Sequence, residues 1–150
     1  MGKEVNLISD VELLARLIQC EAGGEGYTGM EAVATVVMNR VRVDYGEYGR
    51  VSNTIRDVIY QPGQFDCART TLYGRYNPQN IYNMTPDQIH YDIANWAIAG
   101  NRLPAVAYAL WYFNPFSTSC PPSFPSSVGA LTIRIGEHCF YTPTQDYAYT

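Results

Sequence analysis

Residues 10–21 read DVELLARLIQCE, and their apolar side chains recur at the spacing of an amphipathic helix. Leu14, Leu17 and Ile18 share one stripe of this predicted helix. Glu21 follows them by seven, four and three residues, so it lies on the same stripe. The pattern therefore predicts a core helix whose last turn directs a carboxylate inward.

Two effects favour the protonated form of the Glu21 carboxyl. The pair Gly23-Gly24 is typical of a helix end, where the dipole is negative, and an apolar wall removes water from the carboxylate. A carboxylic acid that stays neutral near neutral pH can protonate a leaving group, so Glu21 is a candidate general acid. Two structural alternatives stay open: a helix end that frays into solvent, and one half of a buried ion pair.

The composition indicates one globular domain. The chain has 150 residues, of which 47% are hydrophobic and 16% charged, enough for its own core and unlike a disordered chain. A net charge of −4 argues against non-specific nucleic-acid binding. No apolar run approaches the about 20 residues of a membrane span. The start, Met1-Gly2-Lys3, lacks the regions of a signal peptide, so we expect no export by that route unless the start has been trimmed.

Tyrosines and cysteines give weaker signals. Thirteen tyrosines fit a surface that binds a neutral polar ligand such as a sugar, or equally one that is merely half-buried. The four cysteines form no closely spaced metal or redox motif. We expect Cys20 to be a small buried apolar side chain. A bridge between Cys120 and Cys139, which flank a loop and a strand, stays open.

Capping boxes predict where three helices begin. The pairs are Ser9 with Glu12, Thr28 with Glu31, and Thr85 with Gln88. Pro86 then falls at the first position of its helix, which favours that start. Because its box gives Glu31 a structural role, we do not treat it as a catalytic candidate.

The remaining pattern predicts a mainly helical α+β fold with a small β element near the C-terminus. Residues 29–41 are apolar nearly all round and predict a central buried helix, at whose end Asn39 and Arg40 must find polar partners. Further helices are expected over 54–60 and 86–99, the latter with Ile89, Ile93, Trp96 and Ala97 on one face, and a surface excursion over 66–84. Residues 108–113 are extended or end a helix, 117–127 form an irregular loop, 131–135 alternate as a half-buried strand, and 138–140 are extended. The tail from Pro143 is expected to be loose.

Six blocks of sequence resemble a known family. They are 21–25 (EAGGE), 29–34 (GMEAVA), 39–41 (NRV), 58–65 (VIYQPGQF), 112–115 (YFNP) and 135–140 (IGEHCF). In this order and spacing they resemble the spore cortex-lytic cell-wall hydrolases of the SleB and CwlJ type, over about residues 10–141. The resemblance implies a lysozyme-like domain, similar to lytic transglycosylases, that cleaves peptidoglycan glycan strands during germination. It divides the chain into an extension (1–9), a catalytic domain (10–142) and a tail (143–150).

The resemblance implies that Glu21, the first glutamate of its block, is the catalytic acid. Glycosidases with two carboxylates hold them about 5–5.5 Å or about 6.5–9.5 Å apart, and only Glu25 and Asp66 are other acids near matching blocks. The glycines after Glu21 break the helical spacing to Glu25, which a salt bridge or backbone hydrogen bond explains equally well. We therefore favour one acid: Glu21 protonates the glycosidic oxygen, then accepts the proton of the muramic C6 hydroxyl as a 1,6-anhydro ring closes.

Other matching blocks supply candidates for substrate binding. Gln61, Gln64 and Phe65 in the Pro-Gly turn could line a cleft. Tyr112 and Asn114, in the Asn-Pro block, could orient an N-acetyl group of the sugar or hold Glu21. Turn scaffolding, capping and core packing are equal alternatives for each. His138 is more typical of a partly buried histidine than of a catalyst. The full set is Glu25, Asn39, Gln61, Gln64, Phe65, Tyr112 and Asn114.

The chain also departs from the family pattern. Gly23 stands where the family usually has arginine, and a Ser/Pro loop with Cys120 replaces a tryptophan-bearing stretch. Without a signal segment or binding repeat, the chain is more similar to the CwlJ branch, which is assembled into the spore coat from the mother-cell side. The implied partners are glycan strands with muramic lactam and a spore-coat protein, in the coat or cortex. No metal or other cofactor is expected.

Two rival functions are weighed against this one. A cell-wall amidase or endopeptidase would use Cys67 as nucleophile with His90 or His138 as base, although no activating turn frames Cys67. A non-catalytic spore-coat module that binds sugar would keep the fold and not need Glu21.

Overall fold

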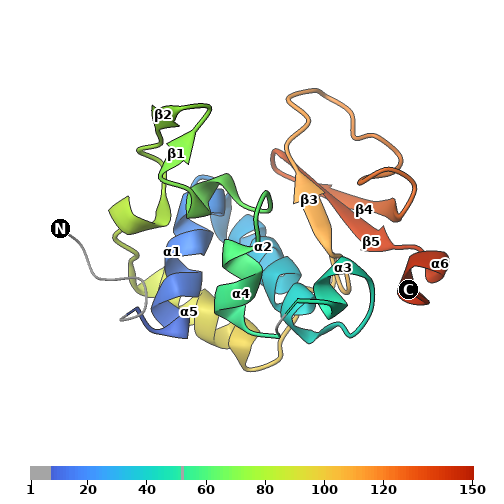
Figure 1. The fold of residues 1–150 in the computed structure, drawn as a ribbon, viewed down its shortest axis with the longest axis horizontal. Coiled ribbons are helices and arrows are strands. Elements are labelled where there is room, and N and C mark those ends of the chain that lie inside the picture. Colours follow the sequence, from blue (N-terminus) through green and yellow to red (C-terminus); the bar gives the residue numbers. More distant parts are fainter. Residues whose placement is uncertain (1–7, 52) are drawn as a thin grey trace.

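The helical part and a small sheet lie side by side in the computed structural model, which describes residues 8–51 and 53–150 (Figure 1). The helices are α1 (Asp10–Ala22), α2 (Gly26–Arg42), α3 (Gly46–Gly49), α4 (Ile55–Tyr60), α5 (Gln88–Ile98) and α6 (Gln145–Ala148), with short 3₁₀ turns η2 (Asp66–Ala68) and η3 (Ile81–Asn83). The strands are β1 (Thr71–Leu72), β2 (Arg75–Tyr76), β3 (Trp111–Phe113), β4 (Gly129–Ile135) and β5 (His138–Pro143). A mainly helical α+β fold with a small β element near the C-terminus is thereby confirmed.

Helix α1 forms as the apolar stripe predicts. Ser9 caps it by accepting a hydrogen bond from the backbone N–H of Glu12 at 3.1 Å, which confirms the first predicted cap. Leu14, Leu17 and Ile18 are fully buried where α1 packs against α2 and α5. Of the predicted extension 1–9, residues 1–7 lie outside the described residues, and Ile8 is buried in the core.

Helix α2 is the central buried helix, but it begins earlier than predicted. Gly26 has a φ of +80°, which turns the chain directly after Glu25, so the helix starts at Gly26. Thr28 therefore lies inside the first turn, and its predicted box with Glu31 is wrong. The far end follows the prediction, since both Asn39 and Arg40 are buried and hydrogen-bonded there.

Helix α5 begins three residues after the predicted cap at Thr85. Its cap is Asp87, whose backbone N–H donates to Nδ1 of His90 at 2.9 Å. Pro86 precedes this cap, so both the Thr85 box and the placement of Pro86 inside the helix are wrong. The buried stripe shifts with the start, because His90 is buried whereas Ile89 is 37% exposed.

The sheet has the order β3-β5-β4, with both pairs antiparallel. Strand β3 confirms the extended form of residues 111–113. A bulge between Leu131 and Ile133 interrupts the predicted alternation of β4 and leaves Leu131 40% exposed. Within the predicted excursion 66–84, the β1-β2 hairpin projects from the helical part, but Asn80 and Ile81 are buried (Figure 1).

The C-terminal tail is not loose. It forms α6, which Thr144 caps. The Tyr147 ring packs edge-on against Trp111 at 5.1 Å, and its hydroxyl accepts a hydrogen bond from the backbone N–H of Glu47 at 2.9 Å. Packing on β3 and α3 therefore orders a segment whose own sequence gives little signal.

All four cysteines are paired. The bridge between Cys120 and Cys139 that the sequence left open is present. Cys20, expected to be a small buried apolar side chain, is instead half-buried and forms a disulfide with Cys67 across 47 residues. Packing of η2 against the end of α1 brings the two sulfurs together, a contact that sequence spacing does not show.

Candidate active site

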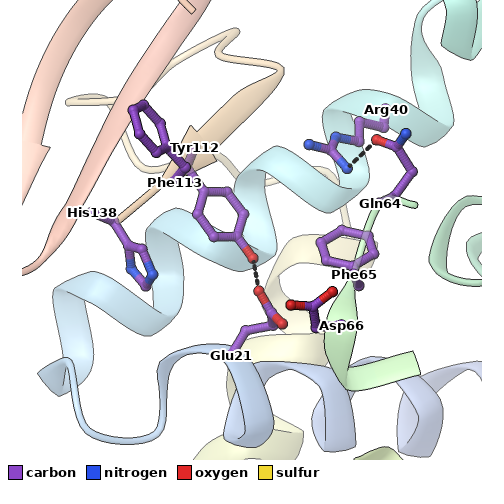
Figure 2. Close-up of a pocket in the computed structure, with 8 residues that line it drawn as sticks. All are labelled: Glu21, Arg40, Gln64, Phe65, Asp66, Tyr112, Phe113 and His138. Carbon is purple, nitrogen blue, oxygen red and sulfur yellow. Dashed lines mark hydrogen bonds between the residues drawn. The ribbon is translucent and has the colours of Figure 1, made fainter. Parts of the chain in front are cut away.

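Glu21 lies in a cavity of about 210 Å³ between the last turn of α1 and the sheet (Figure 2). Four separate parts of the chain line this cavity: α1, α2, the α4–η2 turn and the sheet. The lining residues are Glu21, Arg40, Gln64, Phe65, Asp66, Tyr112, Phe113 and His138. The carboxylate is thus neither frayed into solvent nor paired, since no cation in residues 8–51 and 53–150 lies within ion-pair distance of it.

Burial raises the pKa of Glu21 above its ordinary value of 4.5, and the nearby charge of Asp66 raises it further. Hydrogen bonds from Tyr112 and from the backbone of Cys67, and the charge of Arg40, act in the opposite direction. The net shift is upward, so the carboxyl keeps its proton to a higher pH than an exposed glutamate does.

Tyr112 connects the sheet to this acid. Its hydroxyl donates to Oε1 of Glu21 at 2.6 Å (Figure 2). Burial, and then the charge of Glu21, raise the pKa of Tyr112 well above 10, so it remains a donor. Its ring stacks on Phe140 at 5.5 Å and meets the edge of His138 at 5.0 Å, which holds the hydroxyl in place.

Arg40 supports the opposite wall of the cavity. It is 4% exposed, and its Nε donates to the carbonyl of Leu110 at 2.8 Å. Its guanidinium lies over the rings of Tyr48 and Phe65, at 4.7 and 5.0 Å from their centroids. Aromatic contact and one strong hydrogen bond therefore hold a buried cation close to the acid.

Gln64 presents an unused donor. Its Oε1 accepts from the hydroxyl of Tyr48 at 2.8 Å and from Arg40 at 3.4 Å, which fixes the orientation of the amide. Among the described residues its NH₂ group has no hydrogen-bond partner. The NH₂ group is therefore available to a ligand.

The cavity continues on both sides. A second cavity, of about 220 Å³, shares Arg40, Gln64 and Tyr112 with the first and extends towards Trp111. A third, also of about 220 Å³, shares Phe65 and includes Gln61. The three adjoin one another through shared lining residues, with Glu21 in the central one, and are together called the cleft here; adjoining cavities suit a chain-like ligand better than a compact one.

The predicted binding residues separate into two groups. Gln64, Phe65 and Tyr112 line the cavity with Glu21, and Gln61 lines the adjoining one. The others, Glu25, Asn39 and Asn114, do not line either of these cavities.

These three residues have other partners. Glu25 accepts from the backbone N–H of Glu137 at 2.9 Å and lies 3.3 Å from Nδ1 of His138. Asn39 is buried, and its Nδ2 donates to two carbonyls of the segment before β3. Asn114 accepts from the backbone N–H of Phe116 at 2.8 Å, closing a turn. Each therefore supports the local fold.

Sequence reasoning missed four residues of the cavity: Arg40, Asp66, Phe113 and His138. Asp66 was noted as an acid near a matching block, and that position was the only signal for it. His138 is half-buried as expected; burial lowers its pKa below 6.5, against the opposing charges of Glu25 and Glu137. Since the Cys67 sulfur is bonded to Cys20, it is not a free nucleophile.

Within residues 8–51 and 53–150, no group of three or more His, Cys, Asp or Glu side chains is placed to hold a metal ion. No helix in the same part of the chain is both long and apolar enough to cross a membrane.

Comparison with known proteins gives consistent matches. The family model for Cell Wall Hydrolase matches residues 24–141, a segment that begins just after Glu21. Cell wall hydrolase CwlJ of Bacillus subtilis is 34% identical over 138 residues, which cover 92% of this chain and 88% of that protein. The spore cortex-lytic enzyme of Bacillus subtilis is 31% identical over 133 residues, 88% of this chain and 37% of that protein.

A solved structure supports the fold. The catalytic domain of the germination-specific lytic transglycosylase SleB from Bacillus anthracis superposes with a TM-score of 0.65 at 27% identity. The match covers 94% of this chain and 98% of that domain. Together with the helix content, it confirms the mainly helical, lysozyme-like fold.

Proposed function

The chain belongs to the cell wall hydrolase family of peptidoglycan-cleaving enzymes, and we propose that it cleaves the glycan strands of spore-cortex peptidoglycan as a lytic transglycosylase. In this proposal Glu21 is the catalytic acid. The observation that supports it most is the placement of Glu21: a carboxyl with a raised pKa, without a cationic partner among the described residues, in the middle of an extended cleft.

One carboxyl group performs both proton transfers of the reaction. Protonated Glu21 gives its proton to the glycosidic oxygen, and the bond from that oxygen to C1 of the muramic residue breaks. The oxygen of the C6 hydroxyl then bonds to C1, and its proton passes to the Glu21 carboxylate. The products are a free hydroxyl on the leaving sugar and a 1,6-anhydro ring, and Glu21 is again protonated. No water is consumed.

The surrounding residues bind and orient. Tyr112 fixes the carboxyl through Oε1, which leaves Oε2 for the proton transfers. The NH₂ group of Gln64 donates to a sugar hydroxyl or N-acetyl carbonyl, and Phe65 and Gln61 line the adjoining part of the cleft. Glu25, Asn39 and Asn114 act indirectly, because they hold the loops around the cleft.

The relatives also support a finer biological assignment. CwlJ is named a cell wall hydrolase and SleB a germination-specific enzyme, so a role in the spore follows. We place the chain in the spore coat or cortex, acting on strands that contain muramic lactam, with a spore-coat protein as its partner. A fluorescent fusion that fills the vegetative cell evenly and never marks the spore would contradict this.

Digestion of purified cortex tests the chemistry. Wild-type protein and Glu21→Gln are incubated with cortex, and the soluble fragments are analysed by mass spectrometry. We expect 1,6-anhydro ends with wild type, a loss of at least about 10²-fold with Glu21→Gln, and full activity with Glu31→Gln, whose side chain is outside the cleft. Reducing ends alone would mean hydrolysis. Unchanged release by Glu21→Gln would mean that cleavage does not use Glu21, and no release by either protein would support the non-catalytic sugar-binding module.

A further inference from the structure

A second carboxylate faces the proposed acid. Asp66 begins the η2 turn and lines the same cavity as Glu21, and Figure 2 shows the two carboxylates beside each other. Asp66 is exposed, and no Lys, Arg or His among the described residues lies within ion-pair distance of it. An anion that lacks a protein counter-ion, placed in a cleft, is available to a cation that forms in the substrate.

The disulfide joins the immediate neighbours of these two acids. Cys20 directly precedes Glu21, Cys67 directly follows Asp66, and their Cα atoms are 6.2 Å apart. The backbone of Cys67 also lies close enough to the Glu21 carboxyl to act on its pKa, which it lowers. Asn77 holds the rest of the turn, because its Nδ2 donates to the carbonyls of Asp66 at 3.1 Å and Arg69 at 2.9 Å. A covalent link therefore joins the two segments of chain that carry the carboxylates.

Building on the function proposed above, we propose that Asp66 is the anionic partner of Glu21 in glycan cleavage and that the Cys20–Cys67 disulfide positions the two carboxylates, so that activity requires this bond.

The different surroundings of the two acids give them different roles. Burial raises the pKa of Glu21, which favours its proton, whereas the Asp66 side chain is exposed to solvent; such a difference in surroundings separates the roles of the two carboxylates in glycosidases. As the glycosidic bond breaks, positive charge grows at C1 of the sugar, and a fixed carboxylate nearby stabilises it. Asp66 forms no bond and transfers no proton. Its charge also opposes ionisation of Glu21, which keeps the acid competent at higher pH.

The disulfide matters because η2 is short. This turn has three residues, and Asn77 bonds to its Asp66 carbonyl from the hairpin segment, so packing and the disulfide are what hold it against the end of α1. Once the sulfur–sulfur bond is reduced, the covalent tie between η2 and the end of α1 is lost, and Asp66 is free to move away from Glu21. Fixed charges stabilise a transition state only while their positions are held.

Substitution of Asp66 tests the first half of the proposal. The initial rate of fragment release from purified cortex is measured against pH for wild type, Asp66→Asn, Asp66→Glu and the exposed control Asp92→Asn. We expect Asp66→Asn to lose at least about 10-fold in rate and to shift the alkaline limb of its pH profile to lower pH. Asp66→Glu should regain part of the rate and return the alkaline limb to its wild-type position. Asp92→Asn should match wild type in both. A rate for Asp66→Asn within twofold of wild type, or an unmoved limb, overturns this half.

Selective opening of the bridge tests the second half. The background is Cys120→Ser with Cys139→Ser, in which a reductant can open only the Cys20–Cys67 bond. We expect this background to be active when oxidised, and to lose at least about 10-fold when dithiothreitol reduces it at a temperature where circular dichroism shows native helix. Re-oxidation should restore the rate. Equal rates before and after verified reduction would exclude a positioning role for this bond.

The outcomes separate this inference from the proposed function. If Glu21→Gln is inactive while Asp66→Asn is fully active, the general acid stands and only the role of Asp66 fails. If Glu21→Gln keeps its activity, both proposals fail together.

Discussion

At the scale of single residues, the proton of Glu21 is held by neighbours that act in opposite directions. Burial and Asp66 favour the protonated carboxyl, whereas Tyr112 and Arg40 favour the carboxylate. Removing one neighbour at a time should therefore move the pH profile in a direction that identifies it. In the proposed mechanism Glu21 must be protonated to act, so the alkaline limb of the pH profile, where the rate falls, reports the pKa of Glu21.

We expect Tyr112→Phe to shift this limb to higher pH, the direction opposite to that expected for Asp66→Asn. The change removes the hydrogen bond at 2.6 Å that stabilises the carboxylate, so the pKa of Glu21 rises. The maximal rate should fall by roughly 10-fold, because the carboxyl loses the contact that orients it. Cortex digestion from acid to alkaline pH measures both effects. Tyr108→Phe, an exposed tyrosine, is the control, and a limb that moves to lower pH would contradict the argument.

Glu21→Gln should stabilise the fold at alkaline pH. A group whose folded pKa lies above its unfolded pKa adds stability below the unfolded value and loses it as the pH rises through the folded value. Above that value wild type buries a charge, whereas the glutamine variant does not. We expect the variant to melt a few degrees higher at pH 9 and equally at pH 4, with Glu137→Gln as an exposed control. If the rise in melting temperature of Glu21→Gln over wild type were larger at pH 4 than at pH 9, this explanation would be wrong.

Residue patterns identified only part of the site. Glu21 follows from its helical stripe, and the family resemblance indicated Gln64, Phe65 and Tyr112. Asp66 and Arg40 reach the cavity through contacts that local spacing does not encode: a disulfide across 47 residues and a guanidinium packed between two rings. Tertiary packing alone reveals such neighbours.

At the scale of secondary-structure elements, the sequence predicted which helices form better than it predicted the residues at which they begin. Ser9 caps α1 as predicted, and α4 forms within the expected range 54–60, with Thr54 as its cap. The starts of α2 and α5 were misplaced, because a glycine at positive φ and a buried histidine fix them instead. The prediction of a loose tail was wrong for a related reason, since α6 depends on a tertiary contact, that of Tyr147 with Trp111 of β3.

Substitution of His90 tests the corrected start of α5. His90→Ala removes the acceptor for the Asp87 backbone N–H and empties a buried site, so it should cost about 0.5–2 kcal/mol of unfolding free energy or more. Thr85→Ala should change stability by less than about 0.5 kcal/mol, because Thr85 is not the cap. Urea unfolding followed by circular dichroism compares the two. If Thr85→Ala instead cost more stability than His90→Ala, α5 would begin where the Thr85 box predicts.

At the scale of the whole molecule, the cleft joins two parts that are each closed by their own disulfide. The acid and η2 belong to the helical part, which contains the Cys20–Cys67 bond, and Tyr112 belongs to the sheet, which contains the Cys120–Cys139 bond (Figure 1). Tyr112 connects them through its hydrogen bond to Glu21. Stability and activity should therefore respond differently to the loss of each bond.

Loop length predicts how much each disulfide stabilises the fold. The bonds close loops with sequence separations of 47 and 19, for which chain entropy gives about 4 and about 3 kcal/mol. With about 2–4 °C per kcal/mol for a chain of this length, removal of the Cys120–Cys139 bond should lower Tm by about 6–12 °C. Removal of the Cys20–Cys67 bond should lower it somewhat more.

Two variants, each with both cysteines of one bond replaced by serine, separate the effect on stability from the effect on activity. Calorimetry measures their Tm, and cortex digestion measures their rate at a temperature where both are folded. The Cys120–Cys139 variant should lose stability but keep its rate, since neither cysteine lines the cavity of Glu21. The Cys20–Cys67 variant should lose both. If the rates instead follow Tm, both bonds act through global stability, and the link between η2 and the acid has no special part in cleavage.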